Sequence, residues 1–441
     1  MAVKQTGIII LGASGDLAKR KLIPALAKLY EKNEIDSSCK IIGTGRTEYT
    51  DEGFRERFGC PDDFLNILHY HTGISGLKTY LDSLGTFDRY IIFFSLPPAV
   101  YAKTAEHLFS EGFKENTALI IEKPFGYDYE SSKQLNSSLH TWYDELQIFR
   151  IDHYLAKEAV QNILVFRFAN SIFEPIWNSR FIESIQINGI EDIGVEDRAA
   201  YFDNSGMVRD MVQNHLTQLL CLITMEPPVT LDAEDIRKQK MDVLKAMEIK
   251  RWAKMQYEGY RDEKGVPGDS NTETYAEIEL AINNFRWKDM PVYIRTGKAL
   301  GRKGTEIGIR FKPVPRLLYN IGGSLGRNQI VFTIQPDEAI MLDLSSKIPG
   351  SDTKLIPTKM SFCYHSAFDV EIPEAYRKLL LDALKGDRTL FVSASETELS
   401  WQRYAPVLMP EIPGTYAKGR LPESQLGADW IDFESYGGTC T

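Results

Sequence analysis

The chain has 441 residues, of which 43% are apolar and 25% charged, and it carries a formal net charge of −10. This composition is typical of a globular protein that is long enough for two domains, each with its own core. Because binding to a nucleic-acid backbone or an anionic membrane needs a broad basic surface, the acidic balance excludes both as expected partners.

The first predicted element is a buried strand over residues 7–11, which runs into a glycine turn and then into a helix from residue 19. The turn contains Gly12, Ser14, Gly15, Asp16 and Leu17. Its backbone N–H groups and the positive end of the helix can face a pyrophosphate. The spacing is Gly-x-x-Gly-x-x-Ala rather than the usual Gly-x-Gly-x-x-Gly. The turn alone is therefore weak evidence, and the strand before it and the helix after it strengthen it.

A second strand is predicted over residues 40–45 and ends at Arg46. Dinucleotide-binding domains usually have a carboxylate here, which binds the ribose 2′-hydroxyl. A guanidinium favours a 2′-phosphate instead, and Ser14 is a nearby hydroxyl donor. The sequence thus predicts NADP as cofactor, with NAD as the second candidate. The alternative is that Arg46 is a solvated loop charge.

Two further strands are predicted over residues 90–96 and 118–121, each an apolar run bounded by breakers. With helical stretches between them, these runs fit a parallel sheet that is covered on both faces. The second run ends in Glu122, Lys123 and Pro124. Ligands gather at the carboxyl ends of such strands, so Lys123 is expected at the mouth of the nucleotide cleft. Together these elements predict an α/β Rossmann domain.

The segment over residues 150–158 combines groups that can bind an anion with groups that can move a proton. His153, Tyr154 and Lys157 offer donors suited to a phosphate, and Asp152 can orient a base. The alternative is the start of an amphipathic helix with ordinary surface charges. The domain boundary is placed here, which gives domains 1–152 and 153–441.

A helix is predicted over residues 207–220, and His215 lies on its apolar stripe. The other members of the stripe are Val208, Met211, Val212, Leu219, Leu222 and Ile223. His215 therefore faces inward, where a core histidine with one satisfied hydrogen bond is the alternative to a functional one. Asp210 and Asn214 also lie near this stripe and need polar partners.

Seven motifs in this order resemble the glucose-6-phosphate dehydrogenase family. They are residues 12–22, 122–126, 150–158, 194–215, 293–300, 334–338 and 373–382. The resemblance implies an NADP-dependent oxidoreductase that oxidises C1 of glucose 6-phosphate to the lactone. It also implies a Rossmann domain followed by an α+β domain, whose large and mainly antiparallel sheet forms the dimer interface.

The resemblance also implies a role for each matching residue. His215 would be the general base and Asp152 its carboxylate partner, and no metal is required. The sugar phosphate would be held by His153, Tyr154, Lys157 and Lys303. The sugar hydroxyls would be bound by Glu196, Asp210 and Lys298. Lys123 and Pro124 would lie between the cofactor and the substrate, where Lys123 would contact both and Pro124 the cofactor.

Some positions depart from the family pattern. Ala156 stands where the family usually has glycine, the region over residues 47–88 is short, and the tail from Glu411 follows no expected pattern. These departures leave open a variant substrate, such as an amino or deoxy hexose phosphate, or a non-catalytic homologue that binds a nucleotide or sugar phosphate. A third alternative is another Rossmann sugar oxidoreductase in which Lys123 does the acid/base work.

The five cysteines are widely spread, with no paired spacing for zinc or redox chemistry. A reducing compartment fits this pattern best. No secretory or membrane-spanning segment is visible in the sequence. We therefore expect a cytoplasmic enzyme, and the family resemblance suggests a homodimer or homotetramer.

Overall fold

The computed structural model describes residues 5–314, 326–350, 355–368 and 373–437, which form two compact units. Unit 1 contains the chain up to Ala156 together with Pro228–Lys238 and Pro373–Trp401. Unit 2 contains Lys157–Pro227, Gln239–Ile372 and the chain from Gln402. The predicted boundary after residue 152 falls near the first division of the structure. It did not anticipate the two later segments that return to unit 1.

Unit 1 is built on a seven-stranded sheet with the strand order β15-β6-β5-β4-β1-β2-β3. The strands are β1 Thr6–Leu11, β2 Lys40–Gly45, β3 Leu68–Thr72, β4 Arg89–Phe94, β5 Thr117–Ile121, β6 Ile148–Ile151 and β15 Phe391–Val392. All neighbours are parallel except β15, which runs antiparallel beside β6. The predicted Rossmann-type parallel sheet is confirmed, and β3, β6 and β15 add to its four predicted strands.

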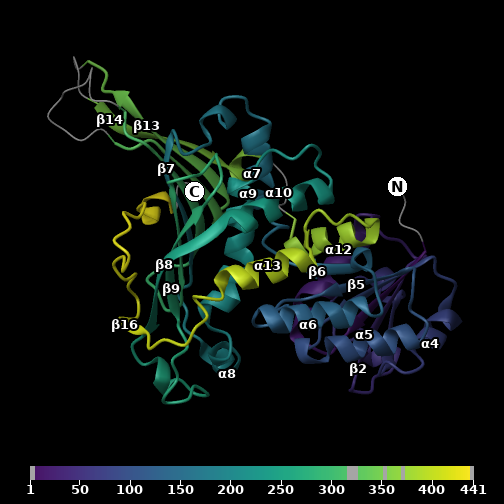
Figure 1. Ribbon diagram of the computed structural model, residues 1–441. Helices are drawn as coiled ribbons and strands as arrows, with labels where there is room; N and C mark the ends of the chain where they lie inside the picture. The colour runs from purple at the N-terminus through teal and green to yellow at the C-terminus, as the bar shows by residue number, and fades with distance from the viewer. Residues whose placement is uncertain (1–4, 315–325, 351–354, 369–372, 438–441) are drawn as a thin grey trace. The chain divides into compact units, whose positions relative to one another are not determined.

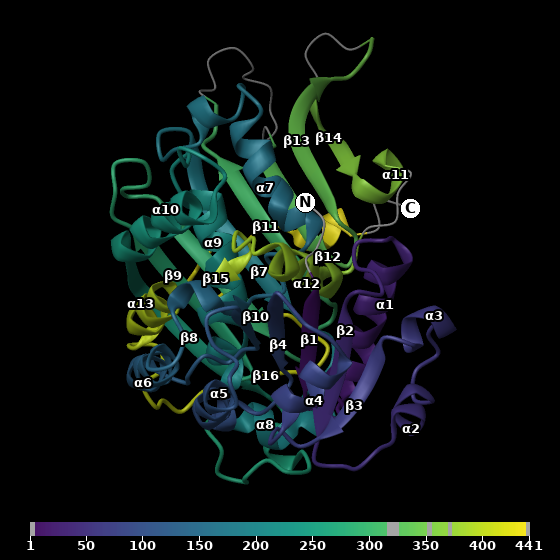
Figure 2. The ribbon, with the colours of Figure 1, turned by 90° about the vertical axis from the view of Figure 1, so that its right-hand side faces the viewer.

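Helices cover both faces of this sheet because alternate residues of β1 point to opposite sides. Ile8 and Ile10 belong to a core with α1 and α12, whereas Ile9 and Leu11 belong to a core with α4, α5 and α6. Figure 2 shows α1 and α12, which are in contact, and Figure 1 shows α5 beside α6. The helices are η1 Ala18–Leu22, α1 Ile23–Glu31, α2 Asp51–Arg55, α3 Asp62–Leu65, α4 Leu77–Leu84, α5 Tyr101–Ser110, α6 Tyr129–His140, α12 Ala375–Lys385 and, up to Trp401, α13 Ala394–Tyr404.

Unit 2 is built on a nine-stranded sheet with the order β14-β13-β12-β11-β7-β10-β9-β8-β16. The strands are β7 Ile182–Ile190, β8 Met247–Tyr257, β9 Tyr275–Ile282, β10 Pro291–Gly297, β11 Gly304–Phe311, β12 Gln329–Gln335, β13 Ala339–Lys347, β14 Leu355–Cys363 and β16 Gly414–Tyr416. Only the β7–β10 and β8–β16 pairs are parallel. The predicted large and mainly antiparallel sheet is thus confirmed. Figure 1 shows β13 and β14 as its long hairpin.

The two faces of this sheet carry different coverings. On one face, Leu216 of η6 (Val208–Leu216) packs so closely on β7 that a Cβ at Gly189 would lie 3.0 Å from its Cδ2 atom. On the other face, the Ile431 N–H donates to the Gln186 side chain at 2.6 Å. The divergent C-terminal tail therefore packs on the sheet. The remaining α-helices are α7 Glu158–Phe168, α8 Ala199–Asp203, α9 Thr217–Thr224, α11 Tyr364–Ala367 and α10 Ala233–Ala246, whose part up to Lys238 belongs to unit 1.

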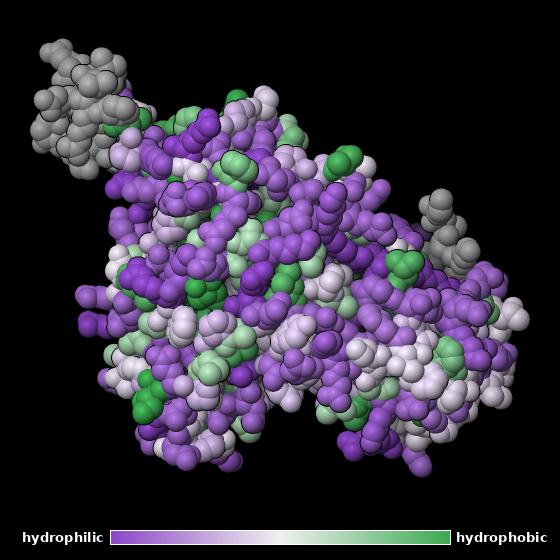
Figure 3. Space-filling view, in the orientation of Figure 1, coloured by the Kyte–Doolittle hydropathy of each residue, from purple (hydrophilic) through white to green (hydrophobic). Residues whose placement is uncertain are grey.

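The surface seen in Figure 3 is mainly hydrophilic, with apolar residues scattered over it. No helix in the described ranges is long and apolar enough to cross a membrane. Cys39, Cys60 and Cys221 are free thiols, whereas Cys363 is disulfide-bonded. The cysteine spacing gave no sign of that bond. Cys440 lies outside the described residues.

Candidate active site

The glycine turn after β1 joins the strand to a helix, and its tight bend requires glycine at its first position. Gly12 has a φ of +80°, and a Cβ there would lie 2.2 Å from the Ser95 carbonyl oxygen, so only glycine fits. The N–H groups of Gly12 and Ala13 both donate to the Thr44 carbonyl, at 2.8 and 3.0 Å. The turn is therefore fastened to the carboxyl end of β2, directly before the helix that starts with η1.

The other predicted turn residues differ in how open they are. Gly15 is exposed and Ser14 partly buried, whereas Leu17 packs against the core of unit 1. The Asp16 carboxylate forms an exposed ion pair with Arg20 at 2.7 Å. Gly12, Ser14 and Gly15 thus form the turn itself, while Leu17 anchors the start of the helix.

Arg46 follows β2 and is exposed. A Cβ at Gly45, the last residue of β2, would lie 3.4 Å from the Ser14 hydroxyl oxygen. The hydroxyl therefore borders the end of the strand from which Arg46 continues. Turn amides, a hydroxyl and a guanidinium are the donors that suit a dinucleotide with a 2′-phosphate.

The Glu122–Phe125 turn follows β5 and is held by three helices. Tyr376 of α12 donates to the Glu122 carboxylate at 3.0 Å, and Tyr101 of α5 donates to its carbonyl at 3.2 Å. Trp401 of α13 donates to the Phe125 carbonyl at 3.0 Å. Burial raises the pKa of Glu122 to about 7, against the lowering effect of the Tyr376 hydrogen bond. This support fixes the backbone on both sides of Lys123 and Pro124, and sequence reasoning missed it.

Asp152 follows β6 and is almost completely buried. Its Oδ1 atom accepts the Tyr154 N–H at 3.0 Å, and its carbonyl accepts the Leu155 N–H at 3.1 Å. The chain therefore turns tightly here instead of starting a helix, which begins only at Glu158. The His153 ring packs on Tyr154 at 5.1 Å and stacks with Tyr376 at 6.5 Å between ring centroids. Asp152, His153 and Tyr154 thus form one ordered turn of unit 1.

Lys157 lies in unit 2 among polar groups from two other segments. Its ammonium donates to the Gln335 side chain at 2.6 Å, and the Glu338 carboxylate accepts the Ala159 N–H at 3.1 Å near the start of α7. Burial lowers the pKa of Lys157; neighbouring Glu338 opposes this effect and neighbouring Lys303 adds to it. The structure therefore brings Lys157 and Lys303 close enough to interact. Gln335 and Glu338 lie in a motif that the sequence analysis noted without a role.

His215 is buried, with 1% of its surface exposed, as the apolar stripe predicted. The predicted helix over residues 207–220 is present, and its part over Val208–Leu216 is wound as a π-helix that continues into α9. The Asn214 side chain bonds locally, because it accepts the His215 N–H at 2.7 Å and donates to the Arg209 carbonyl at 2.9 Å. Such π-wound segments are frequent at functional sites.

Glu196, Asp210 and Lys298 gather around α8. Lys298 lies 5.2 Å over the Phe202 ring and forms an ion pair with Glu191, which sequence reasoning missed. Asp210 adds to the effect of burial in raising the pKa of Tyr201. Glu196 is exposed at a φ of +45°. Unit 2 therefore contains two separate groups of predicted substrate residues: these three near α8, and Lys157 with Lys303.

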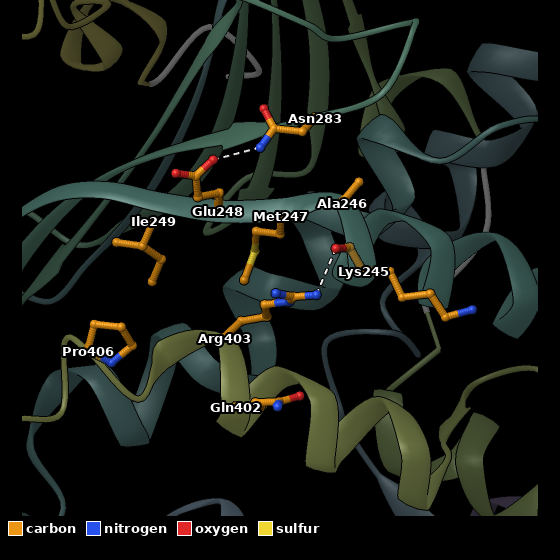
Figure 4. Close-up of a pocket in the computed structure, with 9 residues that line it drawn as sticks. All are labelled: Lys245, Ala246, Met247, Glu248, Ile249, Asn283, Gln402, Arg403 and Pro406. Carbon is orange, nitrogen blue, oxygen red and sulfur yellow. Dashed lines mark hydrogen bonds between the residues drawn. The ribbon is translucent and has the colours of Figure 1, made fainter.

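Two cavities of unit 2 lie elsewhere. The first, of about 460 Å³, is drawn in Figure 4, where Arg403 bonds the Lys245 carbonyl at 2.7 Å and Asn283 bonds Glu248 at 2.7 Å. The second cavity, of about 610 Å³, is lined partly by Arg295, Arg302 and Arg420. Neither contains a predicted site residue. Among the residues described, no cluster of acidic, histidine or cysteine side chains could hold a metal ion.

A Rossmann-type unit followed by a unit on a large, mainly antiparallel sheet is typical of oxidoreductases that use a nicotinamide nucleotide. Family models described as the NAD binding domain and the C-terminal domain of glucose-6-phosphate dehydrogenase match residues 9–162 and 164–422. The chain belongs to the glucose-6-phosphate dehydrogenase family.

Similar proteins and solved structures agree with this family assignment. Glucose-6-phosphate 1-dehydrogenase of Dictyostelium discoideum is 40% identical over 437 residues, which cover 91% of this chain and 88% of the relative. That of Bacillus subtilis (strain 168) is 40% identical over 437 residues, with 89% of each chain covered. A solved glucose-6-phosphate dehydrogenase in complex with glucose-6-phosphate is 35% identical, has a TM-score of 0.90 and covers 96% of this chain and 97% of its own.

A more distant structure bears on the third alternative. A 3-ketoreductase from Actinomadura kijaniata has a TM-score of 0.54 at 12% identity, and this likeness shows the fold alone. The alternative of another Rossmann sugar oxidoreductase is therefore overturned by the family match over both units.

Proposed function

We propose that this protein oxidises C1 of glucose 6-phosphate to 6-phosphoglucono-lactone, with NADP as the hydride acceptor. The observation that carries the proposal is the half-buried ammonium of Lys157, which donates to the Gln335 side chain at 2.6 Å and is a charged donor that suits a phosphate. The relative solved with glucose-6-phosphate supports the identity of that dianion.

In this proposal, Lys157 and Lys303 bind the sugar phosphate by charge, and His153 and Tyr154 add N–H and O–H donors. Gln335 holds the Lys157 ammonium in place through its 2.6 Å hydrogen bond. The phosphate then positions C1 from a distance, so that its binding energy orients the reacting carbon. Burial of Lys157 favours this role, because a partly desolvated ammonium gains more from an anion than an exposed one does.

His215 acts as the general base, which removes the proton of the anomeric hydroxyl as the C1–H bond breaks. Asp152 fixes the tautomer of His215 and stabilises the imidazolium that forms. The two residues belong to different units, and their pairing is part of the proposal. The cofactor supplies the nicotinamide ring that accepts the hydride. The burial of His215 supports its role, because a buried base is shielded from bulk water.

The remaining predicted residues bind the two reactants. The cofactor would be bound at the segment of Gly12, Ser14, Gly15, Asp16 and Leu17, where the turn and the start of the helix would face the pyrophosphate, and Arg46 would bind the 2′-phosphate. Glu196, Asp210 and Lys298 would take the sugar hydroxyls. Lys123 and Pro124, whose turn is fixed by its hydrogen bonds to α5, α12 and α13, would lie between cofactor and sugar.

The test uses glucose 6-phosphate that carries deuterium at C1. The protein should form NADPH that contains this deuterium, together with the lactone or its hydrolysis product, and His215→Asn should abolish most of this transfer. Formation of NADPH without deuterium would place the oxidation at another carbon and overturn the proposal. Absence of NADPH with glucose 6-phosphate, but formation with an amino or deoxy hexose phosphate, would assign the variant substrate instead.

We also propose a homodimer that uses the large sheet. The edge strand β14 exposes Ile356, Met360 and Phe362, which alternate with other residues and so share one face. Replacing Met360 by Lys should convert dimers to monomers in sedimentation equilibrium. A wild-type protein that sediments as a monomer would overturn this assignment.

A cytoplasmic location is likewise proposed; the relative from Solanum tuberosum is a cytoplasmic isoform, whereas that from Spinacia oleracea is chloroplastic.

A further inference from the structure

A second arginine lies beside the glycine turn, and sequence reasoning did not identify it. Arg57 follows α2 and is partly buried. Its Nη2 atom donates to the Ser14 carbonyl at 3.1 Å, and its Nη1 atom donates to the Tyr49 hydroxyl. The guanidinium is thus fixed at the same residue whose hydroxyl borders the end of β2.

A cluster of aromatic residues holds Arg57 there. The guanidinium lies over the Tyr49 ring at 4.9 Å, and that ring packs edge-on against Tyr70 at 5.2 Å. The Tyr70 hydroxyl donates to the Thr47 carbonyl at 2.5 Å, which ties the cluster to the residue after Arg46. Figure 2 shows the setting, with α2 next to β3 and β2 alongside in the sheet. Stacking of this kind keeps an arginine side chain extended and ordered.

The Arg57 guanidinium has more N–H donors than its two hydrogen bonds use. Arginine has five N–H donors, and the two bonds to Ser14 and Tyr49 use one on each terminal nitrogen. The remaining donors can bind an anion placed between Ser14 and the end of β2. The Arg46 side chain starts at that same strand end and is exposed, so an anion there meets one fixed and one adaptable guanidinium.

We propose that Arg57 is a specificity residue that binds the cofactor 2′-phosphate together with Arg46 and Ser14. The inference rests on the proposed use of NADP, and it adds a residue that distinguishes the phosphorylated cofactor from NAD. Arg57 supplies a preorganised contact, because its position is fixed before the cofactor binds. Binding through Arg57 therefore loses less side-chain entropy than binding through Arg46, whose exposed side chain must be ordered when the cofactor binds.

The test measures binding without turnover. Calorimetric titrations of the full chain use adenosine 2′,5′-bisphosphate, which carries the 2′-phosphate, and adenosine 5′-monophosphate, which lacks it. Arg57→Gln should weaken the bisphosphate about tenfold, as for loss of one charge-assisted hydrogen bond, and change the monophosphate less than about twofold. Arg57→Lys keeps the charge and should weaken the bisphosphate by a smaller factor.

Lys133→Gln is the matched control. It also removes a cation that lies over a tyrosine ring, here Tyr129 at 5.9 Å, but on α6, which packs with the opposite face of the sheet. This variant should bind both nucleotides like wild type. In kinetics, Arg57→Gln should raise KM for NADP and leave KM for NAD and both kcat values nearly unchanged.

Two results would overturn the inference. If Arg57→Gln weakens both nucleotides equally, Arg57 only supports the turn; if it changes neither, Arg57 does not reach the phosphate. Should Arg57→Gln fail to fold, Arg57→Lys decides the question by the same comparison. Because the titrations contain no sugar, a failure of the proposed reaction on glucose 6-phosphate would leave their result intact.

Discussion

Replacing Lys157 by alanine should separate phosphate binding from catalysis. The side chain is half-buried, hydrogen-bonded to Gln335 at 2.6 Å and next to Lys303. Loss of one charge-assisted contact to a dianion costs about 2 kcal/mol, which corresponds to about a 30-fold rise in KM for glucose 6-phosphate. Lys303 remains in the variant, so binding should weaken without being abolished.

The assay is the rate of NADPH formation over a range of glucose 6-phosphate concentrations, repeated with free glucose. Lys157→Ala should reduce kcat/KM for the phosphorylated sugar about 30-fold and leave the slow oxidation of glucose nearly unchanged. Free glucose has no phosphate, so it cannot use the ammonium that the variant lacks.

Lys240→Met serves as the matched control. Lys240 is also a buried lysine of unit 2 that donates to a glutamine, here Gln218 at 2.9 Å, but it lies on α10. This variant should lose stability in thermal melts and keep its KM for glucose 6-phosphate. If Lys157→Ala slowed glucose and glucose 6-phosphate by the same factor, the phosphate site assigned to Lys157 would be wrong.

Three further predictions test other parts of the account. His215→Asn should lower kcat about a hundredfold or more with little change in KM, because it removes the base from the chemical step; a higher KM at normal kcat would refute this role. Arg46→Ala should raise KM for NADP about ten- to a hundredfold and affect NAD much less, and equal weakening of both cofactors would make Arg46 structural. Burial raises the folded-state pKa of Glu122 to about 7, from its ordinary 4.5. Protonated Glu122 therefore contributes fully to the free energy of unfolding below pH 4.5, and this contribution is lost as the pH rises through about 7. Relative to Glu122→Gln, which does not titrate, the wild-type melting temperature should fall between pH 4.5 and about pH 7; a constant difference would contradict the raised pKa.

Local patterns in the sequence predicted the elements that depend on local chemistry. The apolar run before Gly12 and the positive φ that this glycine supplies specify a strand and a tight turn together. The burial of His215 followed from its place among apolar neighbours on one helix. Both features depend on residues within a few positions of each other, which is why they are visible in one sequence.

Features that depend on distant segments could not be predicted in this way. Tyr376 reaches Glu122 across 254 residues, and Arg57 reaches Ser14 across 43. The return of Pro373–Trp401 to unit 1 is driven by packing, because Leu379 and Leu380 of α12 lie in the same core as Ile8. No local pattern in the sequence encodes which surface such leucines will cover.

The π-helix around His215 was missed for a different reason. Its apolar residues keep an inward face under either winding, so the spacing does not distinguish a π-turn from an α-turn. The π-winding of Val208–Leu216 is therefore visible only in the structure.

The central claim is that this site selects glucose 6-phosphate through its phosphate. The most direct measurement compares kcat/KM with NADP for glucose 6-phosphate, free glucose, glucosamine 6-phosphate and 2-deoxyglucose 6-phosphate. We expect the highest value for glucose 6-phosphate and a value about a thousandfold lower for free glucose, because the two lysine contacts contribute about 2 kcal/mol each. Similar values for glucose and its 6-phosphate, or a higher value for one of the other sugar phosphates, would contradict it.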